Sequence, residues 1–167
     1  MSTVRVNTYS STHTIAHVTT NLLNFLKEIV RETGLDPAYL MDEWGSLERA
    51  IIAWLNSRDL RTVVLEIYNP STDALVAPRW DLDVIYDYSG DGTLWADSDA
   101  IRYHVRKAGL VPSSCKYRFL LDTRPGRPDV SGWGPTKYRS TEGLKRLGVG
   151  STIGGNGIGT DTTYWRQ

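Results

Sequence analysis

The apolar residues of this chain change their spacing near residue 60, and this change limits the folds that the chain can adopt. Before that point they recur at helical gaps along one face, which comprises Ile15, Val18, Leu22, Leu26, Ile29 and Val30. After it they alternate with residues that are mostly polar, in a set that comprises Trp80, Leu82, Val84, Tyr86 and Tyr88. The first pattern predicts a helix, and the second predicts a strand with one buried face.

The first helix has a loose start and a clear end. A serine or threonine within residues 11–14 is a suitable cap, and Gly34 is a typical residue just beyond a helix C-terminus. The weak alternation of Val4 and Val6 indicates a short strand within residues 1–9.

Two more helices follow from capping signals. Asp36 before Pro37 is a capping residue followed by proline at the first helical position. The apolar face of this second helix comprises Leu40, Trp44, Leu47, Ile51, Trp54 and Leu55. We expect it to end near Ser57, and we expect a third helix from about Asp97 to Gly109.

The remaining body of the chain has the composition of strands. Residues 62–68 (TVVLEIY) are β-branched and aromatic, residues 69–73 (NPSTD) are typical of a turn, and residues 80–88 complete a hairpin. Residues 116–122 (KYRFLLD) predict one more strand. Its centre, residues 119–121, is apolar on both sides, which indicates a central position or contact with a partner.

The bulk properties suit one soluble domain of 167 residues. The formal net charge is zero, which argues against a nucleic-acid partner because domains that bind nucleic acid are usually basic. The single cysteine, Cys115, forms no internal disulfide and is expected to be an inert thiol. No stretch has the length and apolarity of a membrane span, so we expect a cytoplasmic protein without a membrane partner.

A glycine-rich run, GVGSTIGGNGIGT, occupies residues 148–160. Gly150 and Gly155 have the outer spacing of a phosphate loop, but Asn156 and Gly157 stand where lysine and serine or threonine are required. The competing interpretation is a mobile connector, because glycine leaves the backbone many accessible conformations. We favour the connector, and we expect no cofactor.

The last part of the chain also contains many large apolar residues. From Pro125 onward these are Trp133, Tyr138, Leu144, Leu147, Ile153, Ile158, Tyr164 and Trp165. A disordered tail rarely contains so many. We therefore expect residues 125–167 to pack on the body of the protein, with Trp133, Tyr164 and Trp165 pinning them there.

Acidic residues after the hairpin resemble the first half of a calcium loop. Asp87, Ser89, Asp91 and Gly92 have the appropriate spacing, but Ser98 stands at the twelfth position, where a glutamate is required. Alternate aspartates on a strand also mark a solvated face. We prefer the solvated face to a metal site.

Two histidines have the spacing of a zinc-binding pair. His13 and His17 are four residues apart, and His104 is the third histidine of the chain. Histidines near a helix start are more often surface or capping groups. We expect no metal here and no catalytic residue identifiable from the sequence.

The order of these elements resembles that of the bacterial HORMA domains. The resemblance covers nearly the whole chain. It depends on the first helix (THTIAHVTTNLLNFLKEIV), the hairpin (VVLEIYNPSTDALV, then RWDLDVIYDYSGDG), the third helix (IRYHVRKAGL) and the tail (RPGRPDVSGW, then GIGTDTTYWRQ). It implies an α+β fold in which three helices pack on a mostly antiparallel sheet.

The resemblance also implies how such a domain binds. Within one domain of residues 1–167, residues 1–124 form the core and residues 125–167 a C-terminal safety belt. The belt either covers the sheet or locks a partner peptide, which adds a strand to residues 116–122. The expected peptide contacts are Tyr117, Arg118, Phe119, Leu120 and Leu121.

The belt requires hinges and anchors. The expected hinges are Gly148, Gly150, Gly154, Gly155, Gly157 and Gly159. The expected anchors are Trp133, Tyr164 and Trp165.

Partners follow from the resemblance as well. It implies a non-enzymatic signalling adaptor of anti-phage operons (CBASS) that binds a closure-motif peptide and activates a cGAS-like nucleotidyltransferase. It also implies an AAA+ ATPase remodeller that opens the closed form. Two alternatives stay open: a small metal-dependent enzyme that uses Asp81, Asp83 and a histidine, and a plain interaction domain with a fixed tail.

Overall fold

The computed structural model describes residues 3–167, and their side chains except those of residues 3–11 and 77. Within that range the chain forms three helices and six strands. Their bounds, in chain order, are α1 Thr3–Glu32, α2 Ala38–Asn56, β1 Leu60–Tyr68, β2 Leu75–Tyr88, β3 Trp95–Ala96, α3 Ser98–Ala108, β4 Lys116–Thr123, β5 Lys145–Gly154 and β6 Gly157–Arg166.

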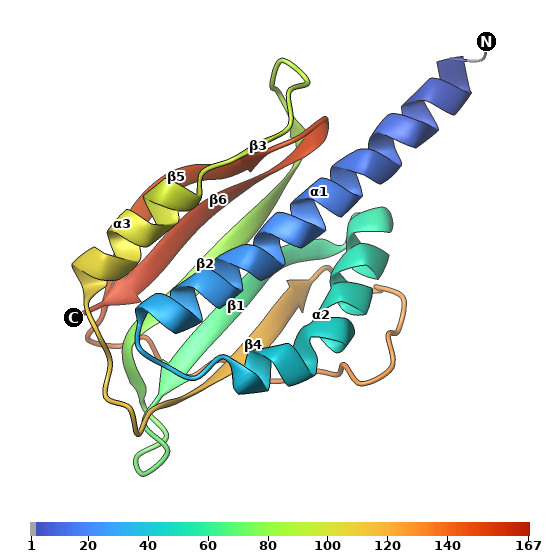
Figure 1. Ribbon diagram of the computed structural model, residues 1–167. Coiled ribbons are helices and arrows are strands. Elements are labelled where there is room, and N and C mark those ends of the chain that lie inside the picture. The colour runs from blue at the N-terminus through green and yellow to red at the C-terminus, as the bar shows by residue number, and fades with distance from the viewer. Residues whose placement is uncertain (1–2) are drawn as a thin grey trace.

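The strands form one sheet in the order β3-β5-β6-β2-β1-β4, and all of its pairings are antiparallel. The three helices cover one face of this sheet, with α1 in the middle, α2 over the β4 side and α3 over the β5 side (Figure 1). The opposite face is called the back face below. The predicted α+β fold, with three helices on a mostly antiparallel sheet, is confirmed.

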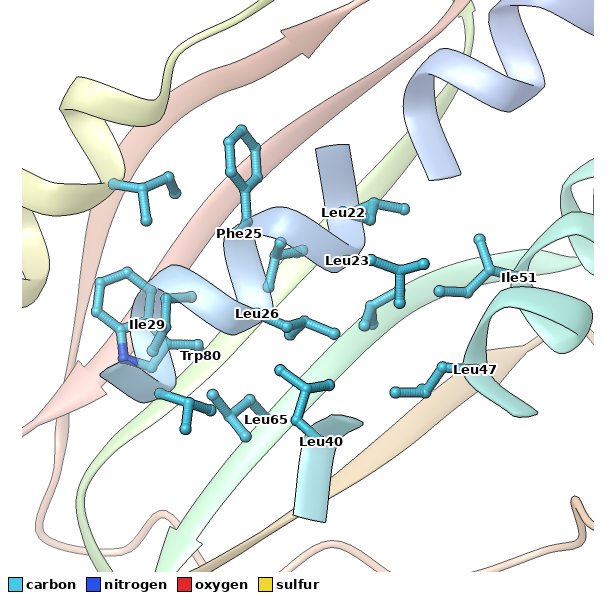
Figure 2. Close-up of a cluster of buried hydrophobic side chains, with 14 of the residues drawn as sticks. Leu22, Leu23, Phe25, Leu26, Ile29, Leu40, Leu47, Ile51, Leu65 and Trp80 are labelled. Carbon is cyan, nitrogen blue, oxygen red and sulfur yellow. The ribbon is translucent and has the colours of Figure 1, made fainter. Parts of the chain in front are cut away.

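The core lies between α1, α2 and the helix-covered face of the sheet (Figure 2). Its largest fully buried side chains include Trp54, Trp80, Tyr164, Phe25, Leu22, Leu26, Leu40, Leu47 and Ile51. Burial of each leucine or isoleucine stabilises the fold by roughly 1.5–3 kcal/mol. The one-sided apolar patterns of helix and strand therefore face each other.

Helix α1 begins at Thr3, so the strand predicted within residues 1–9 is wrong for the described part of that range. An alternation of only Val4 and Val6 is a weak signal, and adding a turn to an existing helix costs far less than nucleating one. The Ala38 N–H donates to Asp36 Oδ1 at 2.9 Å, but the N-cap of α2 is Pro37, so the predicted cap at Asp36 with Pro37 as the first helical residue is wrong by one position.

The C-terminal half differs more from the sequence-based expectation. The glycine-rich run is no connector, since Lys145–Gly154 and Gly157–Arg166 are paired strands. Strand β3 was not predicted. The strand at Lys116–Thr123 lies at the sheet edge, so a central position for it is wrong. Among the described helices, none is both long and apolar enough to cross a membrane.

Candidate functional site

Strand β4 is an edge strand with one open side. It pairs with β1 through eight residues of register, from Lys116 opposite Tyr68 to Thr123 opposite Leu60. In the described chain it has no second strand neighbour. Half of the backbone N–H and C=O groups of such a strand point away from the sheet, where another strand can bind them.

The side chains of β4 alternate between the two faces of the sheet. Tyr117 faces the helices, and its hydroxyl donates to the Asp36 carbonyl at 2.7 Å and accepts from the Leu40 N–H at 3.1 Å. Arg118 points to the back face, where it meets Glu66. These contacts fix β4 against the start of α2 on one side and against β1 on the other.

Residues 124–144, called the crossing segment, connect β4 to β5. The first part of this segment packs on the helix side of the sheet. The Trp54 indole N–H donates to the Pro128 carbonyl at 2.7 Å, and the Trp133 indole N–H donates to Ser46 Oγ at 3.1 Å. The rings of Trp54 and Trp133 meet edge to face, with centroids 6.4 Å apart. Trp133 therefore holds this part of the segment on α2.

The next part of the crossing segment lies on the back face. The Arg139 backbone N–H donates to Glu66 Oε2 at 2.8 Å, and its guanidinium donates to Glu66 Oε1 at 2.9 Å. Since Glu66 neighbours the core residue Leu65 in β1, its side chain projects from the opposite, back face. The chain thus passes over the open edge of β4 between Trp133 and Arg139.

Glu66 is the centre of an ion cluster that comprises Glu66, Asp73, Arg118 and Arg139. The Glu66 side chain is fully buried, and its Oε1 also accepts from Arg118 Nε at 2.7 Å. Arg139 reaches Asp73 Oδ1 at 2.6 Å and lies 3.6 Å from the centroid of the Tyr68 ring. A buried carboxylate requires such partners, so this Glu66 cluster fixes the crossing segment to β1.

A cavity of about 480 Å³ remains between the edge of β4 and the crossing segment. Its floor is β4 from Arg118 to Thr123, and Tyr39 and Trp54 of α2 form one wall. Its roof comprises Gly132, Trp133, Gly134, Pro135, Thr136 and Tyr138. We call this space the edge channel. No backbone hydrogen bond joins β4 to this roof within the described chain, so the open edge faces the partly open edge channel.

The C-terminal hairpin of β5 and β6 completes the sheet on the far side of β2. Tyr164 is fully buried and stacks on Trp80 of β2, with centroids 4.5 Å apart. Its hydroxyl lies 3.0 Å from Nδ1 of His104 in α3. On the back face, the Trp165 indole N–H donates to Asp81 Oδ2 at 3.2 Å.

The glycines of the hairpin permit close packing and a tight turn. Gly157 has a φ of +85°, a left-handed conformation that glycine adopts without strain. A Cβ atom at Gly154 would overlap the Trp95 indole, and one at Gly155 would lie 2.9 Å from the Ile158 carbonyl oxygen. These residues are ordered here; their service as hinges stays a prediction.

A comparison with protein families decides the identity of this arrangement. The family model described as Bacterial HORMA domain 2 matches residues 1–167. The chain is a bacterial HORMA domain. A search of the curated proteins finds no match.

Solved structures share the fold of this HORMA domain at low sequence identity. A chain of the Mitotic Checkpoint Complex has a TM-score of 0.71 and 11% identity, and the match covers 90% of this chain and 98% of that one. C. elegans HTP-2 bound to the HIM-3 closure motif has a TM-score of 0.62 and 12% identity, with coverages of 95% and 90%.

A bacterial structure also matches this HORMA domain. It is the E. coli MS115-1 CdnC:HORMA-deltaN complex, with a TM-score of 0.58 and 14% identity, covering 95% of this chain and 89% of that one. At these identities the likeness concerns the fold alone.

The five predicted peptide contacts occupy β4 of the HORMA domain, and four of them line the edge channel. Phe119, Leu120 and Leu121 line the channel together with Arg118. Tyr117 is buried beneath Tyr39, with ring centroids 5.5 Å apart. Their role in binding stays a prediction.

Two of the histidines considered for metal binding, His17 and His104, contact groups that are not metal ligands. His17 Nε2 lies 3.0 Å from the Trp95 carbonyl oxygen, and its Nδ1 lies 3.2 Å from the Asn21 amide. Burial lowers the pKa of His104, beside Tyr164. Among the described residues, no three His, Cys, Asp or Glu side chains gather as metal ligands do.

The aspartates considered for metal or catalytic chemistry are bonded locally. Asp87 pairs with Arg58 at 3.0 Å, and Asp91 Oδ1 accepts from the Thr93 N–H at 2.9 Å. Asp81 pairs with Arg79 at 2.8 Å. Partial burial raises the pKa of Asp83, whose carboxylate accepts from Thr62 Oγ1 at 2.8 Å. The lone thiol of Cys115 is buried, and burial raises its pKa.

Sequence reasoning missed the Glu66 cluster. One signal was present, because Glu66 is the only charged residue of TVVLEIY and stands between Leu65 and Ile67. A charge inside an apolar strand predicts a buried partner. Its partner Arg139 is 73 residues away, and no sequence spacing connects the two.

Proposed function

We propose that this HORMA domain is a non-enzymatic adaptor that captures a short peptide of a partner protein as an added strand on β4. The observation that supports this most directly is the edge channel. The open backbone edge of β4 lies beside this cavity, whose lining mixes aromatic side chains such as Tyr39 and Trp133 with charged ones such as Arg118. Strand addition obtains affinity from such an edge, and specificity from pockets for alternate side chains.

The crossing segment and the C-terminal hairpin are proposed to be the safety belt of this adaptor. The belt is attached at Trp133 on α2, at Arg139 on the back face and at Tyr164 beside β2. A peptide lying on β4 beneath this chain can leave sideways only after the belt moves. We therefore propose that belt opening limits both loading and release.

The proposed partners follow from the relatives. The resemblance to the HORMA chain of the E. coli CdnC complex, and to HTP-2 with its bound closure motif, supports a closure-motif peptide and a cGAS-like nucleotidyltransferase as partners. The proposed context is anti-phage signalling. Membership of the HORMA family supports an AAA+ ATPase as the remodeller that reopens the belt.

The edge channel provides a sharp test of capture. Gly134 lies in its roof, and a Cβ atom there meets no heavy atom within 4 Å. The Gly134→Trp variant should therefore keep the fold and fill the channel. We expect wild-type protein immobilised in host lysate to retain a nucleotidyltransferase, and Gly134→Trp to lose it, as read by mass spectrometry.

A matched variant controls for the added tryptophan. Gly45 of α2 is exposed, its Cβ position meets only the end of the Arg49 side chain at 3.5 Å, and it does not line the edge channel. Gly45→Trp should retain the partner, and circular dichroism checks the folding of both variants. Equal retention by Gly134→Trp and Gly45→Trp would contradict capture in the channel.

The enzymatic alternative has its own test. Purified protein is incubated with ATP, GTP and phosphodiesters, with and without divalent metal. We expect no turnover. Turnover that disappears in Asp81→Ala or Asp83→Ala would overturn the adaptor proposal.

A further inference from the structure

A second cavity lies beside the edge channel, at the start of β4. It measures about 610 Å³, and its lining includes Leu35, Tyr39, Tyr68, Cys115, Lys116 and Tyr117. The deeper residues are apolar and buried: Leu35, Cys115 and Tyr117 are each 7–8% exposed. We call this cavity the Tyr39 pocket.

Tyr39 separates the two cavities and lines both of them. Its ring stacks on Phe119 with centroids 6.1 Å apart, and it meets Tyr117 edge to face at 5.5 Å. Despite these contacts Tyr39 is 45% exposed. The Tyr39 ring, which packs on Phe119 and Tyr117 of β4, therefore keeps part of its surface exposed at the mouth of the pocket.

The strand geometry determines what reaches this pocket. The edge channel runs along β4 from Arg118 to Thr123, and the Tyr39 pocket lies along Lys116–Arg118 of the same strand. A strand added along β4 therefore passes its mouth. Alternate side chains of that strand point to the helix side of the sheet, where Tyr117 and Tyr39 lie.

We propose that the Tyr39 pocket receives one large apolar or aromatic side chain of the captured peptide, at the end that pairs with the start of β4. This proposal depends on the function proposed above and adds the chemical class of the peptide. The three tyrosine rings of the lining favour a flat or branched apolar group. The pocket shares Tyr39 and Arg118 with the channel and has no lining residue from the crossing segment, so the belt leaves it open.

A random ten-residue peptide library displayed on phage is the probe. It is selected on the wild type, on Tyr39→Ser and on Tyr103→Ser. Tyr103 is a matched control, because it is 62% exposed on α3 and lines neither cavity. Retained clones are then tested on Gly134→Trp, which separates peptides in the edge channel from peptides bound elsewhere.

We expect peptides from the wild type and from Tyr103→Ser to share Leu, Ile, Met, Phe or Trp at one fixed position. Selection on Tyr39→Ser should lose that preference alone. For one selected peptide, Tyr39→Ser or an alanine at the fixed position should each weaken Kd about tenfold, as loss of one aromatic contact does. The two changes together should weaken it little further, because both remove one interaction.

The outcomes distinguish this pocket from the channel. Channel-dependent peptides that keep the same apolar preference on Tyr39→Ser, or that have no fixed apolar position, would overturn the pocket while the proposed function stands. If every peptide binds Gly134→Trp as well as the wild type, the channel is not the binding site and both proposals fail.

Discussion

Asp83 illustrates how a single side chain reports on the back face of the sheet. It is half-buried in β2, opposite Asp161 of β6 and one alternate position from Asp81. Burial raises its pKa, and Asp81 and Asp161 raise it further, whereas Thr62 and Arg146 lower it. The folded state therefore holds the Asp83 proton more tightly than the unfolded chain does.

We predict that Asp83→Asn stabilises the protein at neutral pH. When folding raises the pKa of a carboxyl, the folded protein becomes less stable as the pH rises from the unfolded pKa through the folded pKa of that group. The stability gain of Asp83→Asn over the wild type should be complete above the folded pKa of Asp83. It should vanish below the ordinary aspartate pKa of about 3.9. Because the side chain is 36% exposed, solvent screens the effect and we expect less than about 1 kcal/mol.

Urea denaturation from pH 3 to pH 8 measures this difference. Asp122→Asn is a suitable control, because Asp122 has the same 36% exposure and forms a surface ion pair with Arg61. That variant should gain nothing at neutral pH. A stability advantage of Asp83→Asn that grows as the pH falls would show that the sign is wrong.

At the scale of elements, the sequence indicated helices and the β1–β2 hairpin well. Their apolar residues lie on one face of each element, so the spacing of these residues along the sequence is enough to identify the element. Leu22, Leu26 and Ile29 of α1 are an example. The edge position of β4 was hidden. α2 and the crossing segment cover Phe119 and Leu121. An apolar strand covered in this way has the same sequence pattern as a strand with neighbours on both sides.

The glycine-rich hairpin was hidden for a related reason. Its strand character depends on partners that are distant in sequence. Gly154 fits under Trp95, and Gly159 lies against the ring of Tyr88. Glycine has low strand propensity by itself, so the glycines of β5 and of the start of β6 concealed two strands whose close packing requires them. The Glu66 cluster escaped prediction because Arg139 lies in a segment without periodicity.

We predict that Arg139→Met loosens the belt more than any exposed arginine substitution does. Removal of Arg139 leaves the buried carboxylate of Glu66 with Arg118 alone. Loss of one partner of a buried ion pair is strongly destabilising, so we expect a cost of about 2–3 kcal/mol in urea denaturation. Arg61→Met is the matched control, because Arg61 pairs with Asp122 at the surface and should cost less than about 1 kcal/mol.

A double variant isolates the pair itself. Glu66→Gln removes the charge that Arg139 neutralises. The combined cost of Glu66→Gln and Arg139→Met should therefore be clearly smaller than the sum of the two single costs. Additive costs would mean that the two side chains act independently and that the Glu66 cluster is not a unit.

At the scale of the whole molecule, the proposed belt is part of the sheet as well as a cover. Strand β6 separates β5 from β2, and Tyr164 covers Trp80 in the core. Removal of the chain after Thr160 therefore takes away more than half of β6, although the sequence suggested that the core ends at residue 124. Release of the hairpin would expose β2 as a new edge, which is a hazard for pairing with other chains.

This dual role suggests that the hairpin must move for a peptide to enter, and a reversible tether tests it. Asp83 and Asp161 are direct cross-strand partners on β2 and β6. Opposite residues of antiparallel strands have Cα atoms about 4.5–5.5 Å apart, which a disulfide spans. The Asp83→Cys/Asp161→Cys variant, with Cys115→Ser, should form that bond when oxidised and fix β6 to β2.

We predict opposite effects of the tether before and after loading. A fluorescent peptide from the phage selection, added to oxidised protein, should fail to bind, because the belt does not open. The same peptide added to reduced protein should bind, and oxidation should then slow its dissociation, as measured by anisotropy. Reduction of the tethered protein with dithiothreitol should restore both rates, which makes each sample its own control. If oxidised and reduced proteins load the peptide equally fast, the hairpin does not move during binding, and the peptide must enter by threading beneath the crossing segment.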